Sequence, residues 1–343
     1  MGAKKILLVK LSSLGDVVHA LPVVQDILAT MPDAQIDWVV EKAFAPLLSR
    51  CAGLQRVIPC EIRRWRKSAF SAATRSEWRA FRADLQREAY DAVIDLQGLT
   101  KSALVARLAK MVPGGKRFAL ANQTEGSGYE APTRWVADVA IRMEPHIHAV
   151  QRSRELAARA LGYSFAPAPN FGLNRTEAGM ERAQPAINNI ANKQRPNTVA
   201  FVHGTSRADK EWPLAHWVTL GRQLNAAGYK VALAHGNAKE LATSQAIAEA
   251  LDTPDVMVWP MLSLDALTDE LAQCTGVIGV DSGVSHIAVA LDLPHVQIYN
   301  FDTAWRTGPG GFASAGRQVS VYATPAPGVQ AVWQAWLGCR GKV

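Results

Sequence analysis

The chain has 343 residues, of which 48% are hydrophobic and 20% charged, with a formal net charge of +7. This length exceeds one compact domain and fits two domains of about 150 residues each. The composition is that of an ordinary globular protein, and no apolar run reaches the roughly 18 residues that a membrane-spanning helix needs. We therefore expect a soluble, two-domain protein.

The cysteines and the start of the chain indicate the compartment. Four cysteines (Cys51, Cys60, Cys274 and Cys339) are scattered without a Cys-x-x-Cys pair. This pattern argues against zinc or redox use and favours free thiols in a reducing compartment. The apolar run at residues 6–9 is too short for a signal-peptide core and is better explained as a buried strand. The expected location is the cytoplasm.

Short apolar runs alternate with helical patterns along the chain. The runs are residues 5–9, 36–40, 56–58, 92–95 and 117–120 in the first half, and 198–202, 230–234, 256–259, 277–280 and 296–299 in the second. Amphipathic stretches lie between them at 17–30, 78–88, 153–161, 214–227 and 264–274. Continuous runs rich in Val, Ile and Leu are typical of parallel strands that are buried on both faces. The alternation predicts an α/β protein with two Rossmann-like, doubly wound domains facing a central cleft.

A proline-rich break separates the halves. The helix predicted at 153–161 ends at Gly162, and the prolines of Ser164-Phe-Ala-Pro-Ala-Pro-Asn170 prevent it from continuing. We expect one domain at residues 1–165 and a second at 166–326, beginning with a helix near 175–193. A closing helix and tail should occupy 327–343.

Ligands of such sheets bind beyond the carboxyl ends of the strands, so the loops there are the candidate sites. Lys10-Leu-Ser-Ser-Leu-Gly-Asp16 follows the first strand. Gly15 permits close backbone approach, and the helix dipole favours a carboxylate at Asp16. A helix-capping aspartate without chemistry is the alternative. Gln97 and Lys101, after the fourth strand, are expected to face the same cleft.

The second half offers an anion site. Asp281-Ser-Gly-Val-Ser-His286 follows a strand, and its small residues at a helix start can expose N–H groups to a diphosphate, unless the helix is simply capped and the histidine packed. After another strand, Thr205 and Ser206 can donate to phosphate and Lys210 can neutralise it, unless that loop is only solvated. Glu240 has the chemistry to accept from ribose hydroxyls.

Positive charge is concentrated in residues 62–87, which hold eight Lys or Arg residues against Glu77 and Asp84. Within it, Ile62-Arg-Arg-Trp-Arg-Lys67 interleaves cations with an aromatic side chain. Such a segment can bind nucleic acid, clamp the carboxylates or phosphates of an acidic substrate, or form a solvated face. No Gly-x-Gly-x-x-Gly or phosphate-loop motif occurs, which disfavours hydride transfer and ATP hydrolysis by those routes.

Several motifs in sequence order resemble the lipopolysaccharide heptosyltransferases of glycosyltransferase family nine. They are Val9-Lys-Leu-Ser-Ser-Leu-Gly-Asp16, Trp38-Val-Val-Glu41, Tyr90-Asp-Ala-Val-Ile-Asp-Leu-Gln-Gly98, Lys210-Glu-Trp-Pro213 and Val280-Asp-Ser-Gly-Val-Ser-His286. The stretches at 62–67 and 148–155 resemble the type I branch of the family. The resemblance covers about residues 5–324. It departs at 119–147 and at Ser282, where threonine is usual.

The resemblance implies a GT-B fold with an N-terminal acceptor domain and a C-terminal donor domain. It implies inverting, metal-free transfer of L-glycero-D-manno-heptose from ADP-heptose to the first Kdo of Kdo2-lipid A. Asp16 would be the general base, and Lys210 would stabilise the departing ADP. The donor would be bound by Thr205, Ser206, Lys210, Glu240, Leu262, Asp281, Ser282, Gly283 and His286. The acceptor would be bound by Ser12, Ser13, Gly15, Arg63, Arg64, Lys67, Gln97 and Lys101. No cofactor is expected, and the chain should be a monomer that associates peripherally with the anionic inner-membrane surface.

Three alternatives remain at this point. The type II branch of the same family would use heptosyl-Kdo2-lipid A as its acceptor. A GT-B-like epimerase would act on a free sugar nucleotide, and the basic segment at 62–67 counts against it. A nucleic-acid-binding protein is suggested by the isoelectric point of about 9.3. No RRM, KH or helix-turn-helix pattern accompanies that charge, so we expect no nucleic-acid partner.

Overall fold

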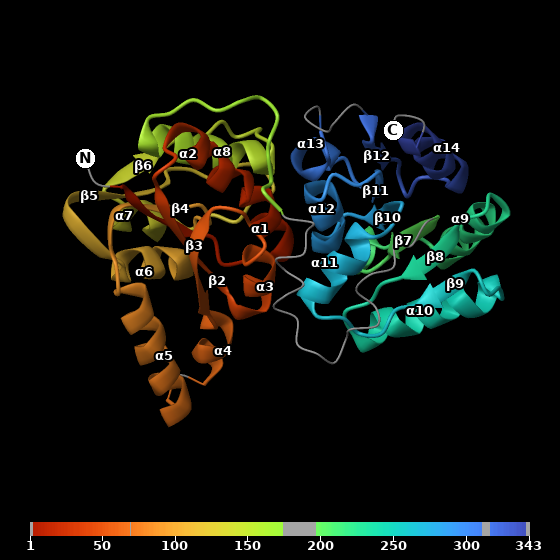
Figure 1. The fold of residues 1–343 in the computed structure, drawn as a ribbon, viewed down its shortest axis with the longest axis horizontal. Coiled ribbons are helices and arrows are strands. Elements are labelled where there is room, and N and C mark those ends of the chain that lie inside the picture. Colours follow the sequence, from red (N-terminus) through yellow and green to blue (C-terminus); the bar gives the residue numbers. More distant parts are fainter. Residues whose placement is uncertain (1–2, 69, 174–196, 311–315, 341–343) are drawn as a thin grey trace. The chain divides into compact units, whose positions relative to one another are not determined.

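The structure is a computed structural model that describes residues 3–68, 70–173, 197–310 and 316–340. It divides into two compact units, Met1–Leu173 and Asn174–Val343 (unit 1 and unit 2). Each unit has a six-stranded sheet with helices around it (Figure 1). The helix predicted near 175–193 lies outside the described residues. No helix within the described ranges is long and apolar enough to cross a membrane.

Unit 1 is built on a parallel sheet whose strand order is β3-β2-β1-β4-β5-β6. Its strands are β1 (Lys5–Val9), β2 (Gln35–Glu41), β3 (Leu54–Cys60), β4 (Ala89–Asp95), β5 (Lys110–Leu120) and β6 (Val139–Ile141). Its helices are α1 (Leu14–Ala20), α2 (Pro22–Thr30), α3 (Ala45–Leu48), α4 (Ile62–Lys67), α5 (Ala72–Leu85), α6 (Thr100–Leu108), α7 (Pro132–Val136) and α8 (Ala149–Leu161). The chain adds strands on one side of β1 and then on the other, so the order reverses between β1 and β4.

Strand β1 shows why this sheet is buried on both faces. Leu7 and Val9 pack in one cluster with Phe81 of α5 and Val105 of α6. The alternate residues Ile6 and Leu8 point to the opposite face by the two-residue period of a strand. All four β1 side chains are fully buried. Two helical layers therefore cover the sheet, as the continuous apolar run predicts.

Unit 2 repeats the architecture with strand order β12-β11-β10-β7-β8-β9. Its strands are β7 (Thr198–Val202), β8 (Lys230–Leu233), β9 (Val256–Val258), β10 (Gly276–Val280), β11 (His295–Tyr299) and β12 (Gln318–Tyr322). Its helices are α9 (Leu214–Ala226), α10 (Ala238–Leu251), α11 (Leu264–Ala272), α12 (Gly283–Ala290), α13 (Ala304–Thr307) and α14 (Val329–Arg340). Here the order reverses between β7 and β10. The closing helix α14 packs in the same core as β7 through Trp336, which is fully buried.

Two predictions differ from the structure, and one segment with no predicted element forms a helix. The helix predicted at 17–30 is two helices that meet at Leu21, because Pro22 has no N–H for a continuous helix and instead begins α2. The basic stretch at 62–67 is the short helix α4. Glu240 was expected in a loop, but it lies in the first turn of α10.

Candidate active site

The strand orders place the candidate loops at the points where each sheet reverses direction. In unit 1, the loop after β1 leads into α1, which carries Asp16, and the loop after β4 holds Gln97. In unit 2, the loop after β7 leads to Lys210 and the loop after β10 begins at Asp281. Open parallel sheets bind ligands beyond the carboxyl ends of the strands at such reversals. Topology therefore supports one candidate binding site in each unit, and we call each of these a half-site.

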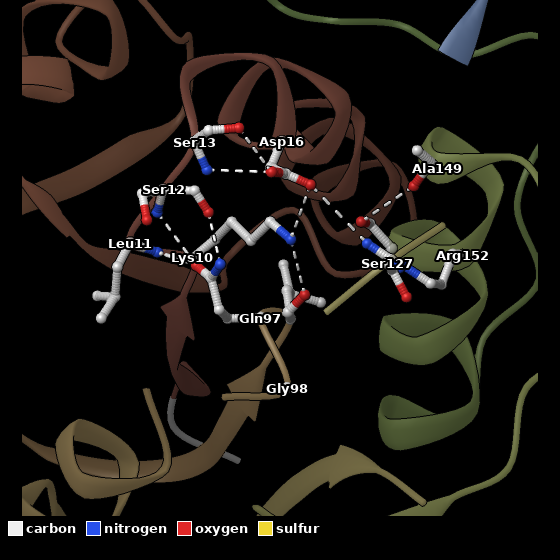
Figure 2. Close-up of polar contacts among 12 residues, drawn as sticks. Lys10, Leu11, Ser12, Ser13, Asp16, Gln97, Gly98, Ser127, Ala149 and Arg152 are labelled. Carbon is white, nitrogen blue, oxygen red and sulfur yellow. Dashed lines mark hydrogen bonds and ion pairs between the residues drawn. The ribbon is translucent and has the colours of Figure 1, made fainter. Parts of the chain in front are cut away.

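In unit 1, the side chain of Gln97 holds the loop between β1 and α1. Its Oε1 accepts from the backbone N–H groups of Leu11 and Ser12 at 2.9 and 3.1 Å, and its Nε2 donates to the Ser12 carbonyl at 2.5 Å (Figure 2). Gln97 is buried. Its amide is therefore engaged with the loop that carries Ser12, Ser13 and Asp16. This geometry favours a positioning role over the direct acceptor contact that the resemblance implies.

Asp16 is the third residue of α1, and its two carboxylate oxygens have different surroundings. Oδ2 accepts from both the backbone N–H and the hydroxyl of Ser13, at 3.0 and 2.8 Å. Oδ1 lies 3.6 Å from Lys10 Nζ and 4.0 Å from Arg152 Nη2 (Figure 2). The side chain is still 38% exposed. Asp16 thus caps its helix through one oxygen and leaves the other beside two cations.

These neighbours decide the ionisation of Asp16. Desolvation alone would raise the pKa of Asp16, but the charge of Lys10, the Ser13 hydrogen bonds and Arg152 outweigh it and lower that pKa to about 2. For Lys10, burial lowers the pKa to about 8 against the attraction of Asp16. Its Nζ also donates to the Leu96 carbonyl at 3.1 Å. Asp16 is therefore a carboxylate, and Lys10 largely an ammonium, at neutral pH.

The predicted acceptor-binding cations separate into two groups. Arg63 Nη2 and Lys101 Nζ both donate to the Ser12 hydroxyl, at 3.1 and 2.8 Å. Arg64 instead forms ion pairs with Glu61 and Glu77. Lys67 is exposed at the end of α4, and Gly15 lies in the first turn of α1 beside Asp16. The structure therefore brings Arg63 and Lys101, but not Arg64, to the loop of Asp16.

In unit 2, Asp281 is the centre of a polar cluster. Lys210 Nζ donates to its Oδ2 at 2.5 Å, while His286 Nε2 and the Thr307 hydroxyl lie 3.4 Å from its Oδ1. The Thr205 hydroxyl donates to the Asp281 carbonyl at 3.2 Å. Burial would raise the pKa of Asp281, but His286 and Lys210 hold it well below its usual range. The carboxylate thus joins the lysine and the histidine in one place.

Helix α12 begins at this cluster. The Ser282 hydroxyl caps it by accepting from the Ser285 N–H at 3.4 Å, and Gly283 is its first residue. A side chain on the preceding Gly279 would place Cβ 2.4 Å from the Ser285 hydroxyl, so the close approach of strand and helix requires glycine here. The first turn of α12 is therefore a tightly built helix start next to Lys210, with the chemistry of an anion site.

The remaining predicted donor residues lie beyond the carboxyl ends of the unit 2 strands. Thr205 and Glu240 both line a cavity of about 450 Å³. Glu240 accepts from the Gly236 N–H and from the Asn237 amide, each at 2.7 Å. Ser206 is exposed in the loop after β7, and Leu262 lies in the loop after β9. These residues follow neighbouring strands, as a bound nucleotide requires.

Three residues that lie in the half-sites have no role predicted from the sequence. Lys10 ends an apolar strand, and Arg152 lies in the 148–155 stretch, so each had a weak signal. Thr307 lies beside Asp281 with no signal in its local sequence. Across the described residues, no three His, Cys, Asp or Glu side chains form a group that could hold a metal ion.

Two Rossmann-like units, one with a presented carboxylate and one with an anion-binding helix start, are typical of sugar-nucleotide-dependent glycosyltransferases. The sequence profile of glycosyltransferase family 9 (heptosyltransferase) matches residues 78–328. Lipopolysaccharide heptosyltransferase 1 of Escherichia coli (strain K12) is 38% identical over 322 residues, which is 94% of each chain. The chain belongs to glycosyltransferase family 9, the heptosyltransferases.

Solved structures confirm the predicted fold class. The E. coli heptosyltransferase WaaC with ADP is similar over 96% of this chain and 98% of that chain, with a TM-score of 0.82 and 34% identity. The same enzyme with ADP-2-deoxy-2-fluoro heptose gives a TM-score of 0.78. Lipopolysaccharide heptosyltransferase 2 of E. coli (strain K12) is only 26% identical, over 86% of this chain and 82% of that protein. Of the two E. coli enzymes, heptosyltransferase 1 is thus the more similar to this chain.

Proposed function

We propose that this heptosyltransferase transfers L-glycero-D-manno-heptose from ADP-heptose to the first Kdo of Kdo2-lipid A. The observation that carries the proposal is the 38% identity to a type I enzyme over 94% of the chain, together with a carboxylate presented at the β1–β4 reversal. The ADP and ADP-heptose analogue bound by WaaC support the donor. The lower identity to the type II enzyme makes heptosyl-Kdo2-lipid A the second candidate acceptor.

Asp16 is the proposed general base. Its Oδ1 takes the proton of the acceptor hydroxyl as that oxygen bonds to the anomeric carbon of heptose. Its low pKa keeps Asp16 ionised over the whole physiological range, so the base is always in its accepting form. Positioned acid–base groups of this kind contribute about 10²–10⁴-fold to rate. Gln97 and Ser13 fix the loop and the carboxylate, and so orient Oδ1.

Unit 2 is proposed to bind the donor and stabilise the leaving group. As the bond from the anomeric carbon to the phosphate oxygen breaks, ADP gains negative charge. Lys210 and the N–H groups of the first turn of α12 are placed to offset that charge. Thr205 and Glu240 line the neighbouring cavity, where the nucleoside would lie. Fixed cations and helix N–H groups can perform this role without a metal, so we propose metal-independent transfer.

Peripheral membrane association is part of the proposal. Phe70, in the turn between α4 and α5, is 93% exposed. Arg66, Lys67 and Arg75, on the flanking turns of the two helices, are also exposed. An aromatic side chain among cations suits the interface of an anionic membrane. We propose that this tip meets the cytoplasmic leaflet. Phe70→Ser should reduce cosedimentation with phosphatidylglycerol vesicles, and unchanged cosedimentation would remove the tip from the proposal.

Mass spectrometry of one reaction tests the central assignment. Purified full chain is incubated with ADP-heptose and either Kdo2-lipid A or heptosyl-Kdo2-lipid A. We expect one heptose to be added to the first acceptor only. Addition to the second alone would favour the type II function, and a changed sugar nucleotide without acceptor would favour an epimerase.

Variants at Asp16 test the mechanism in the same assay. Asp16→Ala should abolish transfer while ADP binding persists, because the residue lies in unit 1. Asp33→Ala removes an exposed carboxylate of the same unit and serves as control. Normal turnover by Asp16→Ala would overturn its role as base.

A further inference from the structure

Unit 1 contains a large cavity that the proposed mechanism does not use. It is formed by α4, α5 and the start of α6, and its volume is about 1140 Å³. That exceeds the roughly 300–1,000 Å³ of most small-molecule sites. Helices α4 and α5 project together from the rest of unit 1 (Figure 1). The cavity is therefore built by a projecting helix pair and one turn of α6.

Its lining combines apolar surface with positive charge. The apolar part includes Trp65, Trp78, Leu99 and Leu104. The cations are Arg63, Arg66, Arg75, Arg79 and Lys101. The one carboxylate, Glu130, accepts from the Thr100 N–H at 2.7 Å. A cavity of this composition matches an anionic amphiphile, with alkyl chain against the aromatic and leucine side chains and phosphate against the arginines.

The aromatic wall is held in place by its own packing. Trp78 packs edge-on against Trp65, with ring centroids 5.6 Å apart, and lies 5.7 Å from the ring of Phe81. The Trp65 N–H donates to Glu77 at 2.7 Å. Leu104, on the α6 side, is 46% exposed. The apolar surface is thus fixed on one side and accessible on the other.

One end of the cavity reaches the acceptor half-site. Arg63 and Lys101 line the cavity and also donate to the hydroxyl of Ser12. Ser12 precedes Ser13, which holds the carboxylate of Asp16. A molecule whose reacting sugar lies at Asp16 can therefore extend past these two cations into the cavity.

We infer that the cavity binds an acyl chain of the lipid acceptor, with Arg66, Arg75 and Arg79 at its rim binding the phosphate of the same lipid. The inference rests on the proposed function and deepens it, because it gives the acylated end of the acceptor a binding site of its own. The proposed ligand is the acceptor lipid, and the experiments distinguish its binding from the binding of bulk membrane lipid.

The first experiment compares acylated with fully deacylated Kdo2-lipid A, both presented in mixed detergent micelles. Each methylene that is removed from water strengthens binding about fourfold. A charged side chain that faces the acyl chain should therefore weaken acceptor binding by a measurable factor. Leu104→Asp should raise KM for the acylated acceptor about tenfold or more and leave KM for the deacylated one within twofold. Leu337→Asp, at a 38% exposed leucine of α14, is the matched control.

The second experiment tests the charged rim with dephosphorylated and phosphorylated acceptor. Arg79→Gln should raise KM for the phosphorylated lipid about tenfold and have little effect on the dephosphorylated one. Arg82→Gln changes an exposed arginine on the same helix that does not line this cavity. Circular dichroism is used to check that each variant is folded.

The outcomes separate the inference from the proposed function. Transfer to both acceptors by the wild type, with Leu104→Asp affecting both equally or neither, would overturn the inference alone. Loss of vesicle cosedimentation in Leu104→Asp without acceptor selectivity would assign the cavity to bulk membrane and also overturn it. No transfer by the wild type to either acceptor would instead overturn the proposed function.

Discussion

Replacing Lys10 by Met should make the protein more stable and less active. The Lys10 side chain is only 2% exposed, and burial lowers its pKa from 10.5 to about 8. Holding the charged form in the folded protein at pH 7 therefore costs about 3 kcal/mol, at 1.36 kcal/mol per pH unit. Met has a similar volume and no charge, but it loses the bond to the Leu96 carbonyl, worth about 1 kcal/mol. The variant should gain about 2 kcal/mol in free energy of unfolding at pH 7.

The pH dependence has a definite sign. Between about pH 8 and 10.5 the unfolded chain binds a proton at Lys10 and the folded chain does not. Stability of the wild type therefore rises with pH across that window, and Lys10→Met lacks this gain. The advantage of the variant should shrink by about 3 kcal/mol and reverse by pH 10.5. Urea unfolding of both proteins at pH 7 and 10.5 measures this difference.

The activity of Lys10→Met should fall in the same pH 7 sample, because Asp16 loses a neighbouring cation that orients its carboxylate. Lys42→Met, at an exposed lysine of unit 1, controls for loss of one positive charge. A variant that is less stable at pH 7, or whose stability difference does not change with pH, would refute the reasoning about Lys10. Full activity of the variant would show that Asp16 does not need Lys10 for its function.

Three further predictions concern the half-sites. Lys210→Ala should lower kcat/KM about 10²-fold or more because the leaving group loses its cation, whereas Lys230→Ala, at an exposed lysine that begins β8, should not; equal effects would remove Lys210 from the site. Activity should survive EDTA, and loss on chelation with rescue by magnesium would contradict metal-independent transfer. Gln97→Ala should lower kcat about tenfold or more by loosening the loop of Asp16, with the KM for ADP-heptose unchanged; an unaltered kcat would show that the clamp is dispensable.

The central strands were predictable from sequence, whereas two of the four edge strands, β6 and β12, were not. Strands β1 and β7 match the predicted ranges because each is paired on both sides and buried on both faces, so nearly every residue is apolar. Strands β6 and β12 were missed. Both are at sheet edges, where β6 has only three residues, one exposed and two half-buried, and β12 includes polar Gln318 and Ser320. These two strands lack the continuous apolar run that marks β1 and β7, whereas the edge strands β3 and β9 contain such a run and match the predictions at 56–58 and 256–259.

The half-sites were predictable where a functional residue comes soon after the end of a strand in the sequence. Asp281 follows β10 directly, and Asp16 lies in the first turn of the helix after β1, so their positions in the sequence identified them. Their neighbours Arg152 and Thr307 come from α8 and α13, 136 and 26 residues away along the chain. Such partners are brought together by tertiary packing, and no local pattern contains them. Gln97 was found by its position, but its engagement with the loop backbone required coordinates.

The two units use the same construction for different purposes. In each, an aspartate after a strand at the sheet reversal is paired with a lysine, Lys10 for Asp16 and Lys210 for Asp281. The difference is access, because Asp16 is 38% exposed and Asp281 only 7%. An exposed carboxylate oxygen can take a proton from substrate, whereas a buried one already bound to lysine and histidine cannot.

Asp281 is therefore expected to position Lys210 and His286 rather than to act as a base. Asp281→Asn keeps an oxygen that can accept one of their hydrogen bonds and should raise KM for ADP-heptose more than it lowers kcat. Asp16→Asn removes the proton acceptor and should lower kcat about 10²–10⁴-fold with KM for ADP-heptose unchanged. Steady-state kinetics of the two variants side by side distinguishes the roles. A loss of kcat alone in Asp281→Asn would mean that this buried carboxylate takes part in the chemical step, and the access argument would fail.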